Sequence, residues 1–260
     1  MQASGAEGAW LKQSDRDRAV RLLWEPPAEP TRGPKAALSQ SRVVEAAMKV
    51  ADAEGVEALT MRRVAETLGF TTMSLYRHVP GKSELLDLMV DAAWGETACV
   101  PKGPWREGLE FYARQMWQMY RAHPWILQLP HSRRTPGPRT MASFDAALAV
   151  VSELGLTAEE MVAVVTAVGH FVDGVGRTMA DRVKAERETG MTEEAWWDGQ
   201  DALWAHFTPE RLPMMTHIWT TGGFERPLDE FEFGLARVLD GLAVFIESED
   251  RPLVRRETCL

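Results

Sequence analysis

Apolar residues recur every three to four positions along most of this chain, which is the spacing of amphipathic α-helices. The first clear stripe begins after Ser39 or Ser41, either of which can cap a helix, and ends at Gly55. Its members are Val43, Ala47, Val50 and Ala51. Three further helices are predicted at about 60–68, 71–79 and 82–95, the first two with Thr60 and Thr71 as caps.

The helical pattern continues through the rest of the chain. Helices are predicted at roughly 104–123, 139–154, 158–187, 192–206 and 229–249. No stretch combines the alternation of a half-buried strand with hairpin-turn signals. The pattern therefore predicts an all-α protein, with an N-terminal helical unit over 39–95 and a larger helical domain over 96–260.

Residues 1–38 form an N-terminal extension that is rich in proline, glycine and charge. One amphipathic helix is predicted over 14–24, with Val20, Leu23 and Trp24 on a common face. The prolines that follow favour an extended linker, because proline interrupts the helical hydrogen-bond ladder.

Composition narrows the class of protein. No apolar run approaches the ~20 residues that a membrane-spanning helix needs. The N-terminal residues lack the basic segment and apolar core of a signal peptide. Cys99 and Cys259 are far apart and form no metal-binding or disulfide pattern, so a cytoplasmic location is expected.

The net charge of −9 argues at first against a nucleic-acid partner, but its distribution changes that interpretation. Residues 96–260 carry 17 basic and 25 acidic side chains, which accounts for most of the acidity. Residues 60–82 carry four basic side chains and one acidic side chain, together with His78. A local basic surface of this kind can face phosphate groups while the rest of the chain remains acidic.

The predicted helices at 60–68 and 71–79 are joined by the short turn Gly69-Phe70, which is the arrangement of a helix-turn-helix. In the second helix Leu75 and Val79 face the core, and the other face carries hydroxyl, thioether, phenol, guanidinium and imidazole groups. Such groups suit the base edges and phosphates of a DNA major groove. Taken alone, the same polarity also fits an ordinary solvated helix face.

The order of residues over 39–95 resembles the DNA-binding domain of the TetR family of bacterial transcriptional repressors. The matching motifs are Ala-Glu-Gly at 53–55, Arg-Val-Ala-x-x-Leu-Gly at 63–69, Ser-Leu-Tyr-x-His at 74–78 and Lys-x-x-Leu-Leu at 82–86. The resemblance implies contacts with double-stranded DNA from Thr60, Arg62, Thr72, Met73, Ser74, Tyr76, Arg77, His78 and Lys82. Thr72 and Met73 occupy positions that vary with the operator, so they are expected to set sequence preference.

The later part of the chain resembles the C-terminal domain of the tetracycline-repressor branch. The shared motifs are Pro-Trp-Arg at 104–106, His-Pro-Trp at 123–125, Gly-Leu-Thr at 155–157, Phe-Glu-Phe-Gly at 231–234 and Leu-Asp-Gly at 239–241. This likeness implies a homodimer, and the apolar faces near 158–180 and 229–248 are the predicted interface.

A small-molecule effector is also implied, because tryptophan and methionine are concentrated in this half of the chain. The predicted lining of its site is Met116, Trp117, Tyr120, Phe144, Val165 and His170. An ordinary filled core explains the same residues, and His170 and Asp173 also fit satisfied core polar groups. No position securely matches the metal-coordinating histidine of the tetracycline repressors, so neither a metal nor another cofactor is expected.

Taken together, the sequence predicts a ligand-responsive repressor that binds a palindromic operator as a homodimer. The alternative is a small-molecule-binding or scaffold protein with a vestigial helix-turn-helix. An enzyme is not expected, because the chain has no His-Glu-x-x-His, no Gly-x-Ser-x-Gly and no dinucleotide-binding glycine motif.

Overall fold

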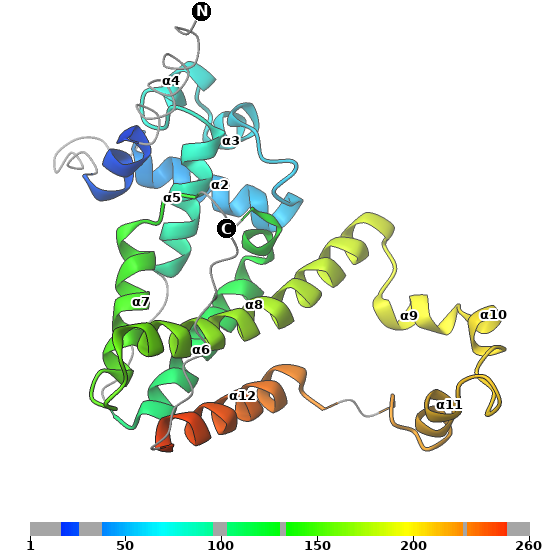
Figure 1. The fold of residues 1–260 in the computed structure, drawn as a ribbon. Coiled ribbons are helices and arrows are strands. Elements are labelled where there is room, and N and C mark those ends of the chain that lie inside the picture. Colours follow the sequence, from blue (N-terminus) through cyan, green and yellow to red (C-terminus); the bar gives the residue numbers. More distant parts are fainter. Residues whose placement is uncertain (1–16, 26–37, 96–102, 131–133, 226–227, 249–260) are drawn as a thin grey trace, which may run out of the picture.

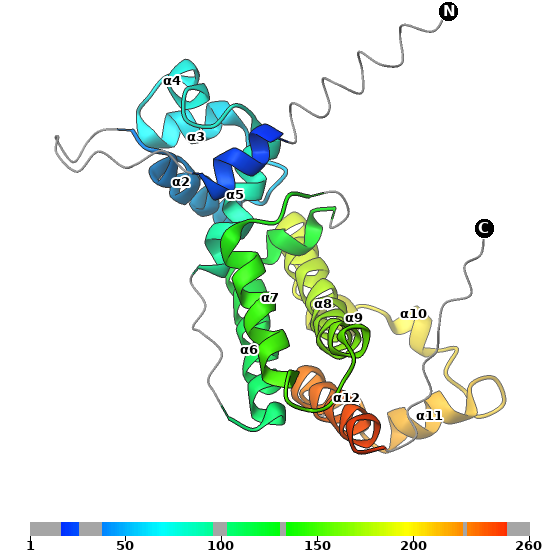
Figure 2. The same ribbon diagram turned by 60° about the vertical axis from the view of Figure 1, so that its left-hand side comes forward.

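The structure, a computed structural model, describes residues 17–25, 38–95, 103–130, 134–225 and 228–248. Every regular element within these residues is a helix, which confirms the predicted all-α fold. An N-terminal unit lies at one end of a larger helical body, and a group of short helices stands apart from that body (Figure 1, Figure 2).

The N-terminal unit consists of α2 (Gln40–Glu54), α3 (Met61–Leu68), α4 (Thr72–Tyr76) and α5 (Lys82–Trp94). The side chains of Ser39, Thr60 and Thr71 each accept a hydrogen bond from a backbone N–H in the first turn of the helix that follows. The predicted caps at Thr60 and Thr71 are thus confirmed, and Ser39 rather than Ser41 caps α2. Leu75 and Val79 are fully buried, so the short α4 segment is held in place by its inner face.

The larger body is arranged around one long helix. It contains α6 (Trp105–Ala122), the short 3-10 helix η1 (Pro124–Gln128), α7 (Pro138–Val151), α8 (Ala158–Thr189) and α12 (Glu230–Glu247). Helix α8 packs against α6, α7, α12 and η1. It begins with a capping box, in which the Thr157 side chain accepts from the Glu160 backbone and the Glu160 side chain accepts from the Thr157 backbone.

Three of the C-terminal sequence motifs position α12 against its neighbours. The Arg106 guanidinium donates to Asp240 Oδ1 at 2.7 Å, which ties α6 to α12. Gly234 lies against Phe171 of α8, and a Cβ at position 234 would overlap that ring. The glycine therefore permits close packing of α12 on α8.

The N-terminal unit is joined to the body through two aspartates, one on α2 and one on α5. Asp52 Oδ1 accepts from Trp125 Nε1 at 2.6 Å and lies 2.8 Å from His123 Nδ1. The His-Pro-Trp motif therefore links the end of α6 to α2. The Arg187 guanidinium, near the end of α8, also donates to the Asp52 carbonyl oxygen at 3.1 Å.

The second aspartate, Asp91, is buried and caps α7 from outside that helix. Its Oδ1 accepts from Arg139 N at 3.0 Å, Thr140 N at 2.9 Å and Thr140 Oγ1 at 3.1 Å. Gly137 makes room for this carboxylate, because a Cβ there would overlap the Asp91 side chain. The carboxylate satisfies N–H groups that begin α7 and would otherwise lack partners.

The N-terminal extension is described only over residues 17–25. Residues 17–24 are helical, within the predicted segment, but of the predicted apolar face only Leu23 is buried. Ala19 and Leu23 are buried, whereas Val20 and Trp24 are about half exposed. Trp24 Nε1 instead donates to the Pro136 carbonyl oxygen at 3.1 Å, just ahead of α7.

The predicted helix at 192–206 is interrupted. Gly199 ends α9 (Glu193–Asp198), and α10 (Asp201–Trp204) begins two residues later. Sequence patterning also missed η1 and α11 (Pro213–Thr220), both of which are short and begin with proline. We refer to residues 192–225 as the aromatic arm, because they carry α9, α10 and α11 with a cluster of aromatic side chains.

Within the described ranges, no helix has the length and hydropathy that a transmembrane segment requires.

Replacing Asp91 by Ala should lower the free energy of unfolding by about 1–3 kcal/mol, because three donors at the start of α7 lose their acceptor. Urea denaturation followed by circular dichroism measures this change. Asp145→Ala on the exposed face of α7 is the matched control and should change stability by less than about 0.5 kcal/mol. Equal losses for the two variants would contradict the capping role of Asp91.

Candidate nucleic-acid interface

Helices α3 and α4 form the predicted helix-turn-helix. Gly69 ends α3 in the left-handed conformation with φ of 73°, a backbone geometry that glycine adopts without strain. The Thr71 side chain then accepts from Ser74 N and lies 2.9 Å from Ser74 Oγ. The turn and the cap together set the direction of α4, which lies at the far end of the molecule from α12 (Figure 1).

The outer face of α4 carries most of the predicted DNA-contacting residues. Met73 is 71% exposed and Tyr76 is 44% exposed, so both side chains are accessible to a ligand. Arg77 is also exposed, and the partly buried members of this face are Thr72, Ser74 and His78. The structure thus brings the predicted residues of α4 to the surface around the fully buried Leu75.

The adjacent arginines of α3 have different surroundings. The Arg62 side chain is 84% exposed, and among the described residues its ion pair is with Glu66 of the same helix, at 2.9 Å. Arg63 instead reaches Glu54 of α2 through two nitrogens, with Nε to Oε1 at 3.0 Å. This hydrogen bonding lowers the pKa of Glu54 from its ordinary value, so the carboxylate stays charged and paired. Arg62 is available to a ligand, whereas Arg63 joins two helices.

Lys82 is the first residue of α5. Its Nζ donates to the Val56 carbonyl oxygen at 3.4 Å, a long bond that a phosphate can replace. Gly81 precedes it as N-cap with no side-chain hydrogen bond to the first turn. Backbone N–H groups at such a helix start, together with an ammonium group, favour an anion.

The predicted effector-site residues are spread over α6, α7 and α8. Met116, Tyr120 and Val165 are buried in the core of the larger body, to which α6 and α8 both contribute. Tyr120 Oη donates to Asp173 Oδ1 at 2.6 Å. Burial, followed by the charge of Asp173, raises the pKa of Tyr120, so its hydroxyl remains a donor. Burial and the same carboxylate raise the pKa of Tyr112 to about 12.

The other predicted effector-site residues have different environments. Trp117 stacks on Phe231 of α12 with ring centroids 5.0 Å apart. Phe144 on α7 is partly buried against the core. His170 is exposed on α8, so within a single chain it does not lie in the core with Met116, Tyr120 and Val165. Asp173, in contrast, is the partner of Tyr120, as expected for a satisfied core polar group.

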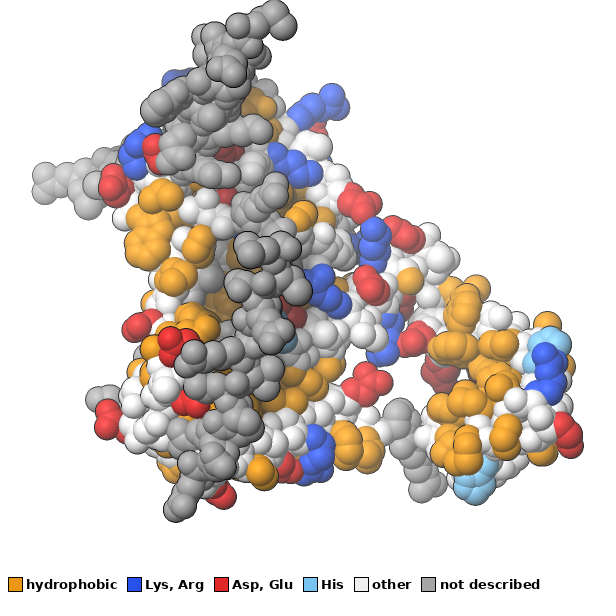
Figure 3. Space-filling model, viewed as in Figure 1, with side chains coloured by type: hydrophobic (Ala, Val, Ile, Leu, Met, Phe, Trp, Pro, Cys, Tyr) orange, Lys and Arg blue, Asp and Glu red, His pale blue; other side chains and the backbone are white. Residues whose placement is uncertain are grey.

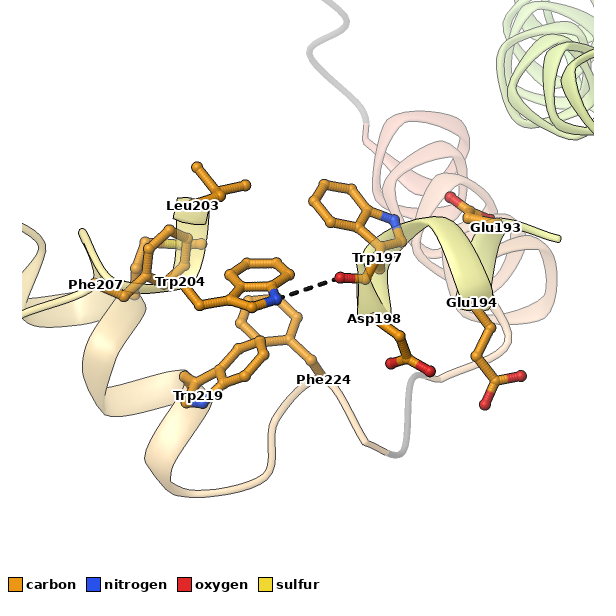
Figure 4. A pocket seen from close by; sticks show the side chains of 10 residues that line it. Glu193, Glu194, Trp197, Asp198, Leu203, Trp204, Phe207, Trp219 and Phe224 are labelled. Atoms are coloured by element: carbon orange, nitrogen blue, oxygen red, sulfur yellow. Dashed lines mark hydrogen bonds between the residues drawn. The ribbon is translucent and has the colours of Figure 1, made fainter. Parts of the chain in front are cut away.

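A cavity that the sequence reasoning missed lies in the aromatic arm. It has a volume of about 720 Å³, and its walls include Trp197, Trp204 and Trp219 (Figure 4). The concentration of tryptophan was the available signal, but on the sequence it fitted either an apolar ligand site or a filled core, and the predicted lining lay within residues 116–170. No group of three or more histidine, cysteine or acidic side chains within the described segments has the placement to hold a metal ion.

Known proteins match both halves of the chain. Residues 43–89 match the family model for bacterial regulatory proteins of the tetR family. Residues 99–246 match the model for the tetracyclin repressor-like C-terminal domain. The HTH-type transcriptional repressor DrrR1 of Streptomyces coeruleorubidus is 43% identical over 236 residues, which are 89% of this chain and 87% of that protein.

More distant relatives share the same architecture. The tetracycline repressor of class A from transposon 1721 of Escherichia coli is 29% identical over 79% of this chain and 91% of that protein. The crystal structure of the TetR-family protein ActR of Streptomyces coelicolor in complex with actinorhodin superposes with a TM-score of 0.67. It is 28% identical and covers 80% of this chain and 97% of that chain.

The contrast between the two arginines of α3 gives a test. Arg62→Ala should leave the free energy of unfolding within about 0.5 kcal/mol of the parent but weaken binding to a duplex that the protein selects. Arg63→Ala should instead lower the thermal unfolding midpoint, because it breaks the bond between α3 and α2. Thermal unfolding and fluorescence anisotropy on labelled duplex measure the two effects. If Arg63→Ala weakened duplex binding and Arg62→Ala lowered stability, Arg63 would be the residue that contacts DNA.

Proposed function

The chain belongs to the TetR family of bacterial transcriptional regulators, and we propose that it is a repressor that binds its operator as a homodimer and is released by a small molecule. The observation that carries this proposal is the exposed outer face of α4, presented by a capped helix-turn-helix.

The geometry of this face supports major-groove readout. The backbone around α4 is held by Leu75 inside and by Thr71 at its start, so the outer side chains project from a fixed support. Thr72 and Met73 can meet base edges, and Arg62 can donate to a guanine or a phosphate. Tyr76 and Lys82 are placed to contact phosphates, which fix register and orientation but carry no sequence information.

The two predicted dimerisation helices each have an inner and an outer apolar surface. Val164, Val165, Val168 and Val172 of α8 and Phe231, Leu235 and Leu239 of α12 are buried within the chain. Val162, Phe233 and Val244 remain exposed on the same two helices. A second copy packed on these outer surfaces would form a four-helix interface and place two α4 helices about 34–36 Å apart.

The effector is proposed to enter the core between α6 and α8. Tyr120 and Asp173 supply a polar pair in otherwise apolar surroundings, which is typical of small-molecule sites. Helix α8 continues from this region to α2, where Arg187 contacts Asp52. A ligand that favours one position of α8 can therefore bias the orientation of α4. Couplings of this kind are typically about 1–3 kcal/mol.

Selection of duplexes from a random pool by the purified protein tests the proposal. We expect two inverted half-sites whose centres lie about one helical turn, or a multiple of it, apart. A pool with no enriched sequence at low salt would contradict the repressor function and favour the alternative of a vestigial helix-turn-helix. Thr72→Ala and Met73→Ala should each change which bases are enriched within the half-site while leaving its spacing unchanged.

Replacing Lys82 by Ala should weaken binding to all duplex sequences by a similar factor. Because one phosphate contact per subunit is lost, the slope of log affinity against log salt should fall by about 1 per half-site. Titration of the selected duplex and of an unrelated duplex at several salt concentrations measures both effects. Glu153→Gln, at an exposed position in the C-terminal half, is the control for a general change of charge. An unchanged slope would exclude a phosphate role for Lys82.

A further inference from the structure

The aromatic arm is separate from the core of the larger body. None of the residues in α9, α10 or α11 is buried, although the arm carries four tryptophans. In both ribbon views it lies beside the body, between the end of α8 and the start of α12 (Figure 2). The space-filling view shows a concentration of hydrophobic side chains over this segment (Figure 3). Such an apolar surface indicates a binding role rather than a packing role.

The aromatic rings of the arm are organised around Trp204. Its ring centroid lies 4.6 Å from that of Trp219 and 5.5 Å from that of Trp197, with interplanar angles of 34° and 30°. Phe207 meets Trp204 edge to face at 5.2 Å. The Trp204 indole N–H donates to the Trp197 carbonyl oxygen at 3.3 Å, which links α10 to α9. The rings therefore have defined relative positions although they are exposed.

These rings enclose the cavity of about 720 Å³, within the usual range for sites that take small organic molecules. Phe224 and Trp219 form one wall with Trp204, and Trp197 lies opposite them (Figure 4). Trp219 is 45% exposed, so part of its ring face is open to solvent. Flat aromatic faces around a space of this size suit a planar ring system that stacks on them.

Acidic side chains line the α9 side of the same cavity. Glu193, Glu194 and Asp198 contribute to its walls. Glu193 pairs with Arg182 of α8, whereas no basic partner of Glu194 or Asp198 is found in the part of the chain that the structure describes. Over 192–225 the arm has six acidic residues and one arginine, a net charge of −5 with histidine neutral. This negative charge favours the binding of a cation and disfavours the binding of an anion.

We propose that the aromatic arm is a binding site for a planar aromatic molecule that carries a protonated amine. The ring system stacks on the exposed ring faces of Trp219 and Phe224 that line the cavity, where apolar surface is removed from water. The ammonium group lies beside Asp198 and Glu194 and gains from the faces of the indole rings. This site is distinct from the α6–α8 core, and its occupation does not depend on the proposed binding of DNA.

Titration of the full-length protein with 9-aminoacridine in the absence of DNA tests this site. The probe is planar and cationic at neutral pH, and acridine is a neutral probe of nearly the same shape. Calorimetry should show tighter binding of 9-aminoacridine. Increasing salt should reduce the preference for the cation, because the carboxylates are exposed and screened.

Two sets of variants separate stacking from charge. The double variant Trp204→Ala/Trp219→Ala should abolish binding of both probes. Glu194→Gln with Asp198→Asn should weaken 9-aminoacridine by about tenfold and leave acridine unchanged. Trp24→Ala removes a similarly exposed tryptophan outside the arm and should change neither affinity. Circular dichroism of each variant verifies that the helices remain folded.

Three outcomes would overturn the proposal. Undiminished binding to the Trp204/Trp219 variant would place the probe elsewhere, and equal binding of the two probes by the parent protein would exclude cation selectivity. If the parent protein binds neither probe and the tryptophan variant changes the oligomeric state in sedimentation, the aromatic surface contacts a second copy instead. None of these results depends on whether the protein binds an operator, so they leave the proposed repressor function unaffected.

Discussion

The position of the DNA-binding helices depends on the hydrogen bonds that two aspartates make to the larger helical body. Asp52 of α2 accepts from Trp125 at 2.6 Å and contacts His123, and the buried Asp91 of α5 caps α7. Hydrogen bonds to charged groups are stronger than those between neutral groups, and an unpaired buried partner is costly. The N-terminal unit can therefore reorient only if these contacts are rearranged, which gives the protein a physical connection between its two ends.

Helix α8 runs between the core of the larger body and the N-terminal unit, so it can link the two. Its 32 residues span about 48 Å, which is long enough to reach from the packing surface with α12 to the α2–α3 turn. Along this length it contributes Asp173 to the core with α6, and near its end Lys184 pairs with Glu57 at 2.6 Å. Under the proposed function, a small displacement of α8 at its middle would be transmitted to the turn that precedes α3. The aromatic arm begins shortly after this helix, so a ligand bound there would act on the same element.

Helical periodicity and residue order were sufficient to predict the all-α fold and the buried inner face of α4. The buried stripe of α2, the caps at Thr60 and Thr71, and the burial of Leu75 all depend on local spacing, which is visible in one sequence. The contacts that join the N-terminal unit to the larger body could not be predicted from one sequence. Asp52 and Asp91 bond to partners that are 73 and 49 residues away along the chain. The α9–α10 break follows from one glycine in an otherwise helical segment. The aromatic cavity was not predicted, because composition shows that tryptophans are numerous but not which of them face one another.

Site-specific photocross-linking at Met73 tests the central claim most directly, namely that the outer face of α4 enters the major groove. A photoreactive amino acid at position 73 should cross-link to a base within each half-site of the selected duplex, since this side chain is 71% exposed on that face. The same amino acid at Met141, which is 40% exposed on α7 and outside the proposed dimer surface, should give no cross-link to DNA. Equal yields from the two positions, or cross-links from position 141 alone, would contradict insertion of α4 into the groove.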